Sequence, residues 1–310
     1  MDFYTNVCRT RDKILVKGYQ GNKQHLMKVA YRPNHYVLSK KGDTAFRSLD
    51  GRPLEPVNLD TMGGARKFRE QYNQVDGFEI HGYDKYIYTY IAEKFHGDIE
   101  WDYTQIKIAT LDIECESENG FPEPTLAEEK VNAITIKPFR KNAHTFGIGP
   151  WNECPKNVVY HECENEAFLL EAFIKYWRKE SFDIITGWNV DAFDMTYLCN
   201  RVDKLFGEGS HKKFSPWNMS DVRDYVNNYG NKVVVFNLYG VNVIDYMALY
   251  KQRTFVNQES YSLDHISHLE LDKQKIDYSE YGNLHTLYKN NYSLYLEYNV
   301  KDVTLVEDLE

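Results

Sequence analysis

The chain has 310 residues, of which 42% are apolar and 27% charged, so it can bury a sizeable core and its length predicts about two domains. This composition excludes a disordered or low-complexity chain, and we expect neither a transmembrane helix nor a secretory signal. The five cysteines include no C-x-x-C pair, which predicts free thiols in a reducing compartment.

The net charge of −9 is spread unevenly along the chain. Residues 1–104 hold 16 of the 37 Lys and Arg residues and 14 of the 46 Asp and Glu residues, a net charge of +2. The remaining residues hold 21 against 32, a net charge of −11. This excess of acid is either a solvated surface or includes carboxylates gathered to hold divalent cations. The spacing of motifs has to distinguish the two.

Residues 1–104 have the pattern of a small α+β domain. The predicted elements are strands at 4–8, 13–19 and 25–31, a turn at Asp50-Gly51-Arg52-Pro53 and a short helix at 63–72.

Residues 105–310 have the pattern of an α/β domain. The first three predicted strands are joined by short connections, which makes them antiparallel neighbours. The predicted elements are strands at 105–115, 131–137 and 143–148, a helix at 165–179 capped by Asn165, a strand at 183–186, a helix at 195–206 ended by Gly207, a β-hairpin at 222–238 around a turn at 227–231, a strand at 240–245, and helices at 261–271 and 284–310. This order resembles the ribonuclease-H-like layout, a mixed sheet flanked by helices, here with an inserted β-hairpin.

Four acidic residues occupy informative positions in this second part. Asp112 and Glu114 lie two apart at the end of a strand, so their side chains share one face and repel each other unless a cation neutralises them. Asp194 lies at or near the start of a helix, where it could simply be an N-cap. Tyr298 and Asp302, four residues apart, project from one face of the last helix. Taken singly, each position also has an ordinary structural explanation.

The ordered combination is more specific than its parts. A strand-borne D-x-E is followed by N-x-x-x-F-D and then by Y-x-x-x-D. This series is similar to the three exonuclease motifs of the DEDDy proofreading nucleases. Hydrolysis of a 3′-terminal nucleotide requires in-line attack of water on phosphorus, which two divalent ions about 3.5–4 Å apart can support. Hard carboxylate oxygens suit Mg²⁺ or Mn²⁺.

Neighbouring residues narrow the resemblance. The supporting segments are Leu111-Asp112-Ile113-Glu114, Gly120-Phe121-Pro122-Glu123-Pro124, Ile185-Thr186-Gly187-Trp188-Asn189, Asp245-Tyr246 and Tyr261-Ser262-Leu263-Asp264. In this order they resemble the N-terminal and 3′→5′ exonuclease regions of family B DNA polymerases from T-even-type bacteriophages.

The resemblance implies a role for each motif residue. Asp112, Glu114 and Asp302 would bind the metal that holds the nucleophilic water, and Glu114 would help to position that water. Asp112 would also bridge to a second metal, which Asp194 would support through water. The hydroxyl of Tyr298 would orient the attacking water.

The resemblance also implies how the substrate is held. Asn189 and Phe193 would shape the site around the terminal nucleotide. Phe121 is similar to a phenylalanine that stacks on bases of the frayed primer strand, and such stacking is typically worth about 1–3 kcal/mol per base. The hairpin at 222–238 is similar to one that helps to separate primer from template.

The partners follow from the same resemblance. We expect single-stranded or primer-template DNA as substrate, a sliding clamp and a single-strand-binding protein as contacts, no membrane, and the cytoplasm, that of the host cell for a phage protein. The D-T-D-S and S-L-Y-P-S motifs of the polymerase region do not occur. We therefore expect this chain not to polymerise DNA alone, with the polymerase portion separate or missing.

Two alternatives to the exonuclease prediction stay open. Residues 1–104, with their mild positive charge, could form an RNA-binding regulatory module without catalysis. The second part could be a stand-alone ribonuclease-H-like nuclease acting on RNA. The predicted domains are therefore 1–104, with nucleic-acid binding as one reading, and 105–310, the exonuclease domain.

Overall fold

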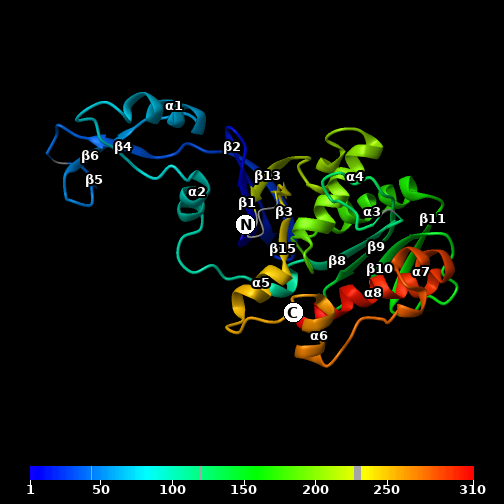
Figure 1. Ribbon diagram of the computed structural model, residues 1–310. Coiled ribbons are helices and arrows are strands. Elements are labelled where there is room, and N and C mark those ends of the chain that lie inside the picture. The colour runs from blue at the N-terminus through cyan, green and yellow to red at the C-terminus, as the bar shows by residue number, and fades with distance from the viewer. Residues whose placement is uncertain (43, 119, 227–231) are drawn as a thin grey trace. The chain divides into compact units, whose positions relative to one another are not determined.

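The computed structural model describes residues 1–42, 44–118, 120–226 and 232–310 (Figure 1). The chain divides into two compact units, residues 1–105 and residues 106–310. All five cysteines are free thiols. Within the four described stretches, every helix is too short or too polar to span a bilayer.

Among its described residues, the first unit contains two small antiparallel sheets and two helices. Its elements are β1 (Phe3–Arg9), β2 (Lys13–Gln20), β3 (Lys23–Ala30), β4 (His35–Leu38), β5 (Phe46–Arg47), β6 (Pro53–Val57), α1 (Met62–Tyr72), β7 (Ile80–His81), α2 (Tyr86–Lys94) and a 3₁₀ turn (Tyr103–Gln105). One sheet has the order β1-β2-β3 and the other β5-β6-β4-β7. The sequence predicted one helix and the first three strands. It missed α2 and the second sheet, whose strands have only two to five residues.

The core of the first unit joins β2 to both helices. Ile14 and Val16 of β2 pack in one cluster with Met62 of α1 and with Tyr86 and Tyr90 of α2. All five side chains are less than 9% exposed. The two helices are therefore fixed against the same strand.

The second unit contains one six-stranded sheet, a two-stranded hairpin and six helices among its described residues. Its elements are β8 (Ile108–Cys115), β9 (Val131–Pro138), β10 (Ala143–Ile148), β11 (Val158–Cys163), α3 (Glu166–Glu180), β12 (Ile184–Gly187), a π-helical turn (Asp191–Met195), α4 (Thr196–Phe206), a 3₁₀ turn (Ser210–Phe214), β13 (Ser220–Val226), β14 (Lys232–Leu238), β15 (Asn242–Asp245), α5 (Tyr246–Arg253), α6 (Leu263–Leu271), a second 3₁₀ turn (Ser279–Tyr281), α7 (Leu284–Asn290) and α8 (Tyr292–Leu309).

The sheet is mixed and has helices on both faces. Its order is β11-β10-β9-β8-β12-β15, with β9 antiparallel to both neighbours and the other pairs parallel. Side chains on one face, such as Ile134 and Phe146, pack with those of α3 and α4. Those on the opposite face, such as Ala133 and Ala143, pack with α7 and α8 (Figure 1). The prediction of a mixed sheet flanked by helices is confirmed.

Several local predictions need correction. The edge strand β11 and helix α5 were missed. The helix predicted over 284–310 is two helices, because Asn291 separates them and caps α8 by accepting a hydrogen bond from the Leu294 N–H, 3.1 Å. The hairpin predicted at 222–238 corresponds to β13 and β14, whose antiparallel pairing runs from Ser220 with Leu238 to Val226 with Lys232. Its predicted turn, 227–231, lies outside the described residues.

A buried ion pair ties α3 to α4. The guanidinium of Arg201 binds both carboxylate oxygens of Glu166 at 2.7 Å, and both side chains are less than 10% exposed. Arg201 also donates to the carbonyls of Ala127 and Glu128, while Glu166 accepts from the Val131 N–H. This network fixes the end of the connection between β8 and β9, because its hydrogen bonds reach the carbonyls of Ala127 and Glu128 and the N–H of Val131.

We expect Arg201→Ala to lower the free energy of unfolding by about 3–5 kcal/mol, since it leaves the buried Glu166 carboxylate without its counter-ion. Chemical denaturation measures the change. Lys204→Ala is the matched control: Lys204 lies on the same helix with an exposed amine 3.5 Å from the Leu126 carbonyl, and its loss should cost less than about 0.5 kcal/mol. Equal costs for the two variants would contradict a structural role for the pair.

Candidate active site

Strand β8 presents two carboxylates to the α8 face of the sheet. Asp112 and Glu114 alternate with Leu111 and Ile113, which belong to the core cluster on the α3 and α4 face. Glu114 lies opposite Ala133 of β9, and Ala133 packs on the α7 and α8 side. The two acidic side chains therefore point to the same face, as the period of a strand requires.

Helix α8 lies against β8 and completes the cluster. It carries Tyr298 and Asp302 on one face, and both are at most 6% exposed. One carboxylate oxygen each from Asp112, Glu114 and Asp302 lies within 4.8 Å of the others. These residues are close enough to coordinate one divalent cation together, because such ions bind oxygen ligands at about 2.0–2.6 Å.

Two further features of the donor set fit a cation. All three groups offer hard oxygen ligands, and the buried Oδ1 atom of Asp302 has no hydrogen-bond partner among the described residues. Burial raises the pKa of Asp112 and of Asp302, and it raises that of Glu114 to about 8. The neighbouring carboxylates add to the rise for Asp112 and Glu114. A divalent cation would remove this repulsion.

Lys275 supplies the positive charge at this site, and the sequence analysis missed it. Its Nζ atom lies 2.5 Å from Asp302 Oδ2, donates to the Tyr298 hydroxyl at 2.9 Å, and lies 4.9 Å from the centre of the Tyr298 ring. Burial lowers the pKa of Lys275, but Asp302, Tyr298 and Asp112 outweigh burial and raise it above the ordinary value. No pattern marks this lysine, because it lies in a connection 23 residues before Tyr298.

Asn299 is the second residue that the motifs did not identify. It is fully buried on α8, and its side-chain amide donates to Asp112 Oδ2 at 2.6 Å. The sequence did contain an indication of this residue. An amide side chain three residues before Asp302 on a helix lies on the same face as that acid. Asn299 connects α8 to β8 directly and so fixes the orientation of the Asp112 carboxylate.

Asp194, also predicted as a metal ligand, is not among the carboxylates that lie within 4.8 Å of one another, but its charge acts on Asp112 and Glu114 and it contacts the same strand. It belongs to the π-helical turn before α4, is 3% exposed, and accepts the Ile113 N–H at 3.0 Å. The paired part of β12 reaches only as far as Thr110 of β8, which leaves the Ile113 N–H available. Burial raises the pKa of Asp194 to about 8. The side chain thus binds β8 rather than capping its own helix.

Gly187 allows this close packing. A Cβ atom at this position would lie 2.5 Å from the Leu111 carbonyl oxygen and 2.9 Å from the Val190 side chain. The end of β12 can therefore approach β8 only with glycine here. The chain then turns through Asn189, whose φ is 63° and whose N–H donates to Asp245 Oδ1 at 3.1 Å.

The predicted substrate-binding aromatic residues form a short row. Phe121 is 84% exposed, and its ring centre lies 5.2 Å from that of Phe193. Phe193 in turn lies 5.9 Å from Tyr197. Asn189 is the third predicted substrate residue, and its backbone N–H donates to Asp245 Oδ1. An exposed aromatic ring supported from behind by a second ring is suited to stacking on a base.

Comparison with known proteins identifies the family. Residues 79–266 match the model of the DNA polymerase family B exonuclease domain. The chain belongs to this family. Over its whole length it is 29% identical to the DNA-directed DNA polymerase of Escherichia phage RB69 and 27% identical to that of Enterobacteria phage T4. It spans 37% of the length of each.

One herpesvirus polymerase matches a smaller share of this chain. The DNA polymerase catalytic subunit of human herpesvirus 7 is 30% identical over 54% of this chain and 17% of its own length. The match to the two phage polymerases confirms the resemblance read from the motifs. Tyr298 and Asp302 lie beyond the residues of the family model, but within the alignments to both phage proteins.

We expect the stability of the metal-free protein to fall as the pH rises from about 5 to about 8. Glu114 and Asp194 titrate near pH 4 in an unfolded chain but only near pH 8 in the folded protein. Between these values the folded state binds more protons, so each pH unit lowers the free energy of unfolding, by up to about 1.4 kcal/mol per group. Urea unfolding in EDTA at several pH values measures the slope.

The matched variants show whether the slope arises at this site. Asp112→Asn/Glu114→Gln should make it shallower, leaving the contribution of Asp194, whereas Glu171→Gln, which alters an exposed carboxylate on α3, should leave it unchanged. Added Mg²⁺ should stabilise the unsubstituted protein more at pH 8 than at pH 5, because the cation competes with the protons. An unchanged slope in the double variant would show that these carboxylates are not its source.

Proposed function

We propose that this chain is a 3′→5′ exonuclease that removes nucleotides from the 3′ end of DNA with two divalent ions, Mg²⁺ or Mn²⁺. The observation that carries the proposal is the convergence of Asp112, Glu114 and Asp302 to within 4.8 Å, although nearly 190 residues separate Asp302 from the strand pair. Membership of the family B exonuclease domain supports a nuclease reaction. The 3′→5′ direction of digestion and the number of two ions are parts of this proposal.

The residues have distinct proposed tasks. Asp112, Glu114 and Asp302 would hold the first ion, and Asp112 with Asp194 the second. When bound, the ions activate water for attack on phosphorus and stabilise the leaving 3′ oxygen. Tyr298, held by Lys275 at 2.9 Å, would orient the water through its hydroxyl. Burial of these groups excludes bulk water and strengthens each electrostatic contact.

Lys275 has a proposed positioning role in this scheme. Its ammonium contacts Tyr298 and Asp302 together, so it fixes the phenolic oxygen relative to a metal ligand. It also lowers the electrostatic cost of holding several carboxylates in one buried place. Asn299 would act similarly on Asp112 from the same helix.

The substrate would be a single-stranded or frayed DNA end. Phe121, supported by Phe193, would stack on a base, while Asn189 and Phe193 would enclose the terminal nucleotide. The hairpin of β13 and β14 would help to separate the primer from its template. Each of these roles follows the family resemblance together with the exposure of the Phe121 ring.

In its wider context the chain would proofread for a family B replicative polymerase. We propose a ribonuclease-H-like layout for the exonuclease domain, 105–310, preceded by an N-terminal domain, 1–104. A polymerase portion would be the partner, and the host-cell cytoplasm the compartment.

We expect Asp112→Ala/Glu114→Ala to lower the rate of DNA digestion by about a thousand-fold or more, because metal-ion catalysis contributes several kcal/mol. The assay follows a 5′-labelled DNA oligonucleotide with Mg²⁺, with and without EDTA, and the same sequence as RNA. Glu118→Ala, an exposed acid in the following connection, should retain full activity. A product ladder that persists in the double variant would contradict the proposal, and a preference for RNA would favour a ribonuclease.

We expect Tyr298→Phe to slow digestion by about 10- to 100-fold, since it removes only the hydroxyl that would orient water. The Mg²⁺ concentration that gives half-maximal rate should stay the same, because the carboxylates are intact. Tyr278→Phe is the control: its ring packs edge-on against Tyr298 with centres 5.3 Å apart. Full activity of Tyr298→Phe would remove the hydroxyl from the mechanism.

A further inference from the structure

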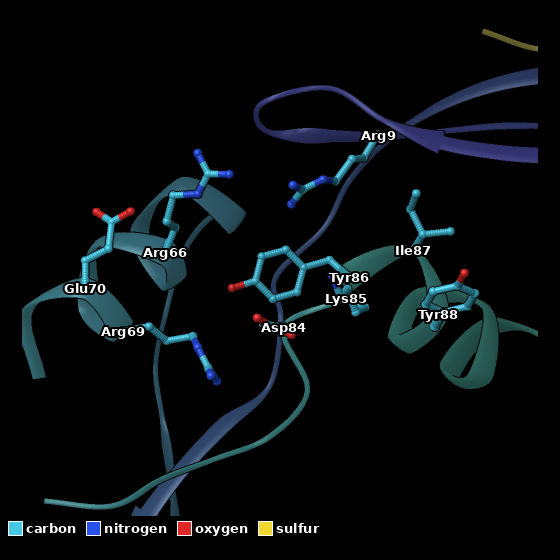
Figure 2. Close-up of a pocket in the computed structure, with 9 residues that line it drawn as sticks. All are labelled: Arg9, Arg66, Arg69, Glu70, Asp84, Lys85, Tyr86, Ile87 and Tyr88. Carbon is cyan, nitrogen blue, oxygen red and sulfur yellow. The ribbon is translucent and has the colours of Figure 1, made fainter. Parts of the chain in front are cut away.

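The first unit contains an arginine-lined pocket of about 420 Å³, distinct from the carboxylate cluster of the second unit (Figure 2). Three of its lining residues are arginines that come from two separate segments. Arg9 ends β1, while Arg66 and Arg69 lie three residues apart on α1 and so share a helix face. The volume is within the range of pockets that bind small molecules, about 300–1,000 Å³.

The three guanidinium groups gather around Tyr86, the first residue of α2. Arg9 lies over the ring at 5.8 Å from its centre, and Figure 2 shows the hydroxyl directed toward the helix that carries Arg66 and Arg69. Burial raises the pKa of Tyr86, while Arg69, Arg9 and Arg66 each oppose that rise. The hydroxyl therefore experiences the charge of all three arginines.

The floor of the pocket is rigidly held. Tyr86 is 3% exposed, and its hydroxyl hydrogen-bonds Nε2 of the fully buried His35 at 3.2 Å. Met62 at the start of α1 packs in the same cluster as Tyr86. The arginines thus project from elements that share one core, and the side chains of Arg9 and Arg66 are exposed to solvent where a ligand can reach them.

The positive charge of the pocket is not neutralised within the protein. Among the residues that the structure describes, Arg9, Arg66 and Arg69 make no ion pair, and Arg69 donates to the Gly82 carbonyl, 3.3 Å. The lining also contains one lysine and two acids, Glu70 and Asp84, which leaves a net charge of +2. A phosphate carries nearly two negative charges at neutral pH.

We infer that this pocket binds the phosphomonoester group of a nucleotide, either free or at the 5′ end of a nucleic-acid strand. Three guanidinium forks that approach from two segments match a group with three or four acceptor oxygens better than they match a carboxylate, which has two. The pocket is larger than a phosphate and leaves room for the attached sugar and base. The inference does not rest on the proposed nuclease activity, because its residues lie in the other unit.

The full chain in EDTA, which suppresses metal-dependent hydrolysis, tests the inference. Deoxyadenosine 5′-monophosphate is titrated by calorimetry, and deoxyadenosine is the probe without phosphate. A 5′-phosphorylated oligonucleotide and its 5′-hydroxyl counterpart are compared by fluorescence polarisation. Binding of the monophosphate supports a free nucleotide as ligand, whereas tighter binding of the 5′-phosphorylated oligonucleotide alone supports the end of a strand.

Arg66→Ala/Arg69→Ala should weaken this binding at least about 10-fold, because each charge-assisted contact contributes on the order of 1.5–3 kcal/mol. Lys67→Ala removes an exposed charge from the same helix without touching the pocket and should change the affinity less than about twofold. Arg9→Gln tests the pocket from β1 and keeps the inference testable if the double variant fails to fold.

The inference is overturned if the monophosphate does not bind and the 5′-phosphorylated oligonucleotide binds no more tightly than its 5′-hydroxyl counterpart. It is also overturned if deoxyadenosine binds as well as its monophosphate, or if Lys67→Ala weakens binding as much as the arginine variants do. Arg66→Ala/Arg69→Ala should digest the 5′-labelled oligonucleotide in Mg²⁺ at the rate of the unsubstituted chain, because both residues lie outside the carboxylate cluster. Failure of the nuclease proposal and failure of this one are therefore separate results.

Discussion

Electrostatic repulsion among buried carboxylates is the constraint on which the second unit depends. Asp112, Glu114 and Asp302 are held within 4.8 Å of each other at the junction of β8 and α8, where Glu114 and Asp302 are buried and Asp112 is partly buried. Such an arrangement is costly unless positive charge or protons compensate it. The ammonium of Lys275 and the amide of Asn299 provide part of that compensation. The repulsion that these two groups leave uncompensated explains why the site suits a divalent cation.

The sheet topology makes this arrangement possible. β8 is an interior strand, so its backbone is fixed by β9 on one side and by β12 on the other. Beyond Thr110, however, the pairing with β12 ends, and Asp194 binds the freed N–H of Ile113. One strand thus presents two carboxylates through its side chains and fixes another through its backbone. The rigid sheet holds the acids in place, and the helices complete the site.

The sequence was most informative where a pattern is local and regular. The strands β8, β9 and β10 and helix α3 follow from alternating or helical apolar spacing, and Asn165 indeed caps α3 by accepting the Phe168 N–H. The three motifs also identified the acids that the structure places around β8. Their ligand roles remain predictions, because a spacing gives proximity but not coordination.

What the sequence could not provide depends on contacts between distant segments. Lys275 lies in an irregular connection, and only the fold reveals that its ammonium reaches α8. Helix α5 is eight residues long with little difference between its faces, and β11 is a six-residue edge strand in which apolar and polar side chains are mixed without regular alternation. The arginine pocket likewise joins β1 to α1, which lie more than 50 residues apart.

The backbone of Lys275 is anchored by a residue whose motif had no evident task. Asp264, in the first turn of α6, accepts the Lys275 N–H at 2.8 Å. Its side chain therefore affects the site through main-chain geometry, and its negative charge adds to the raised pKa of Asp302. Among natural relatives, a short acceptor such as asparagine could replace it without displacing the ammonium. A longer glutamate would shift the entire connection, so evolutionary tolerance here should follow side-chain length.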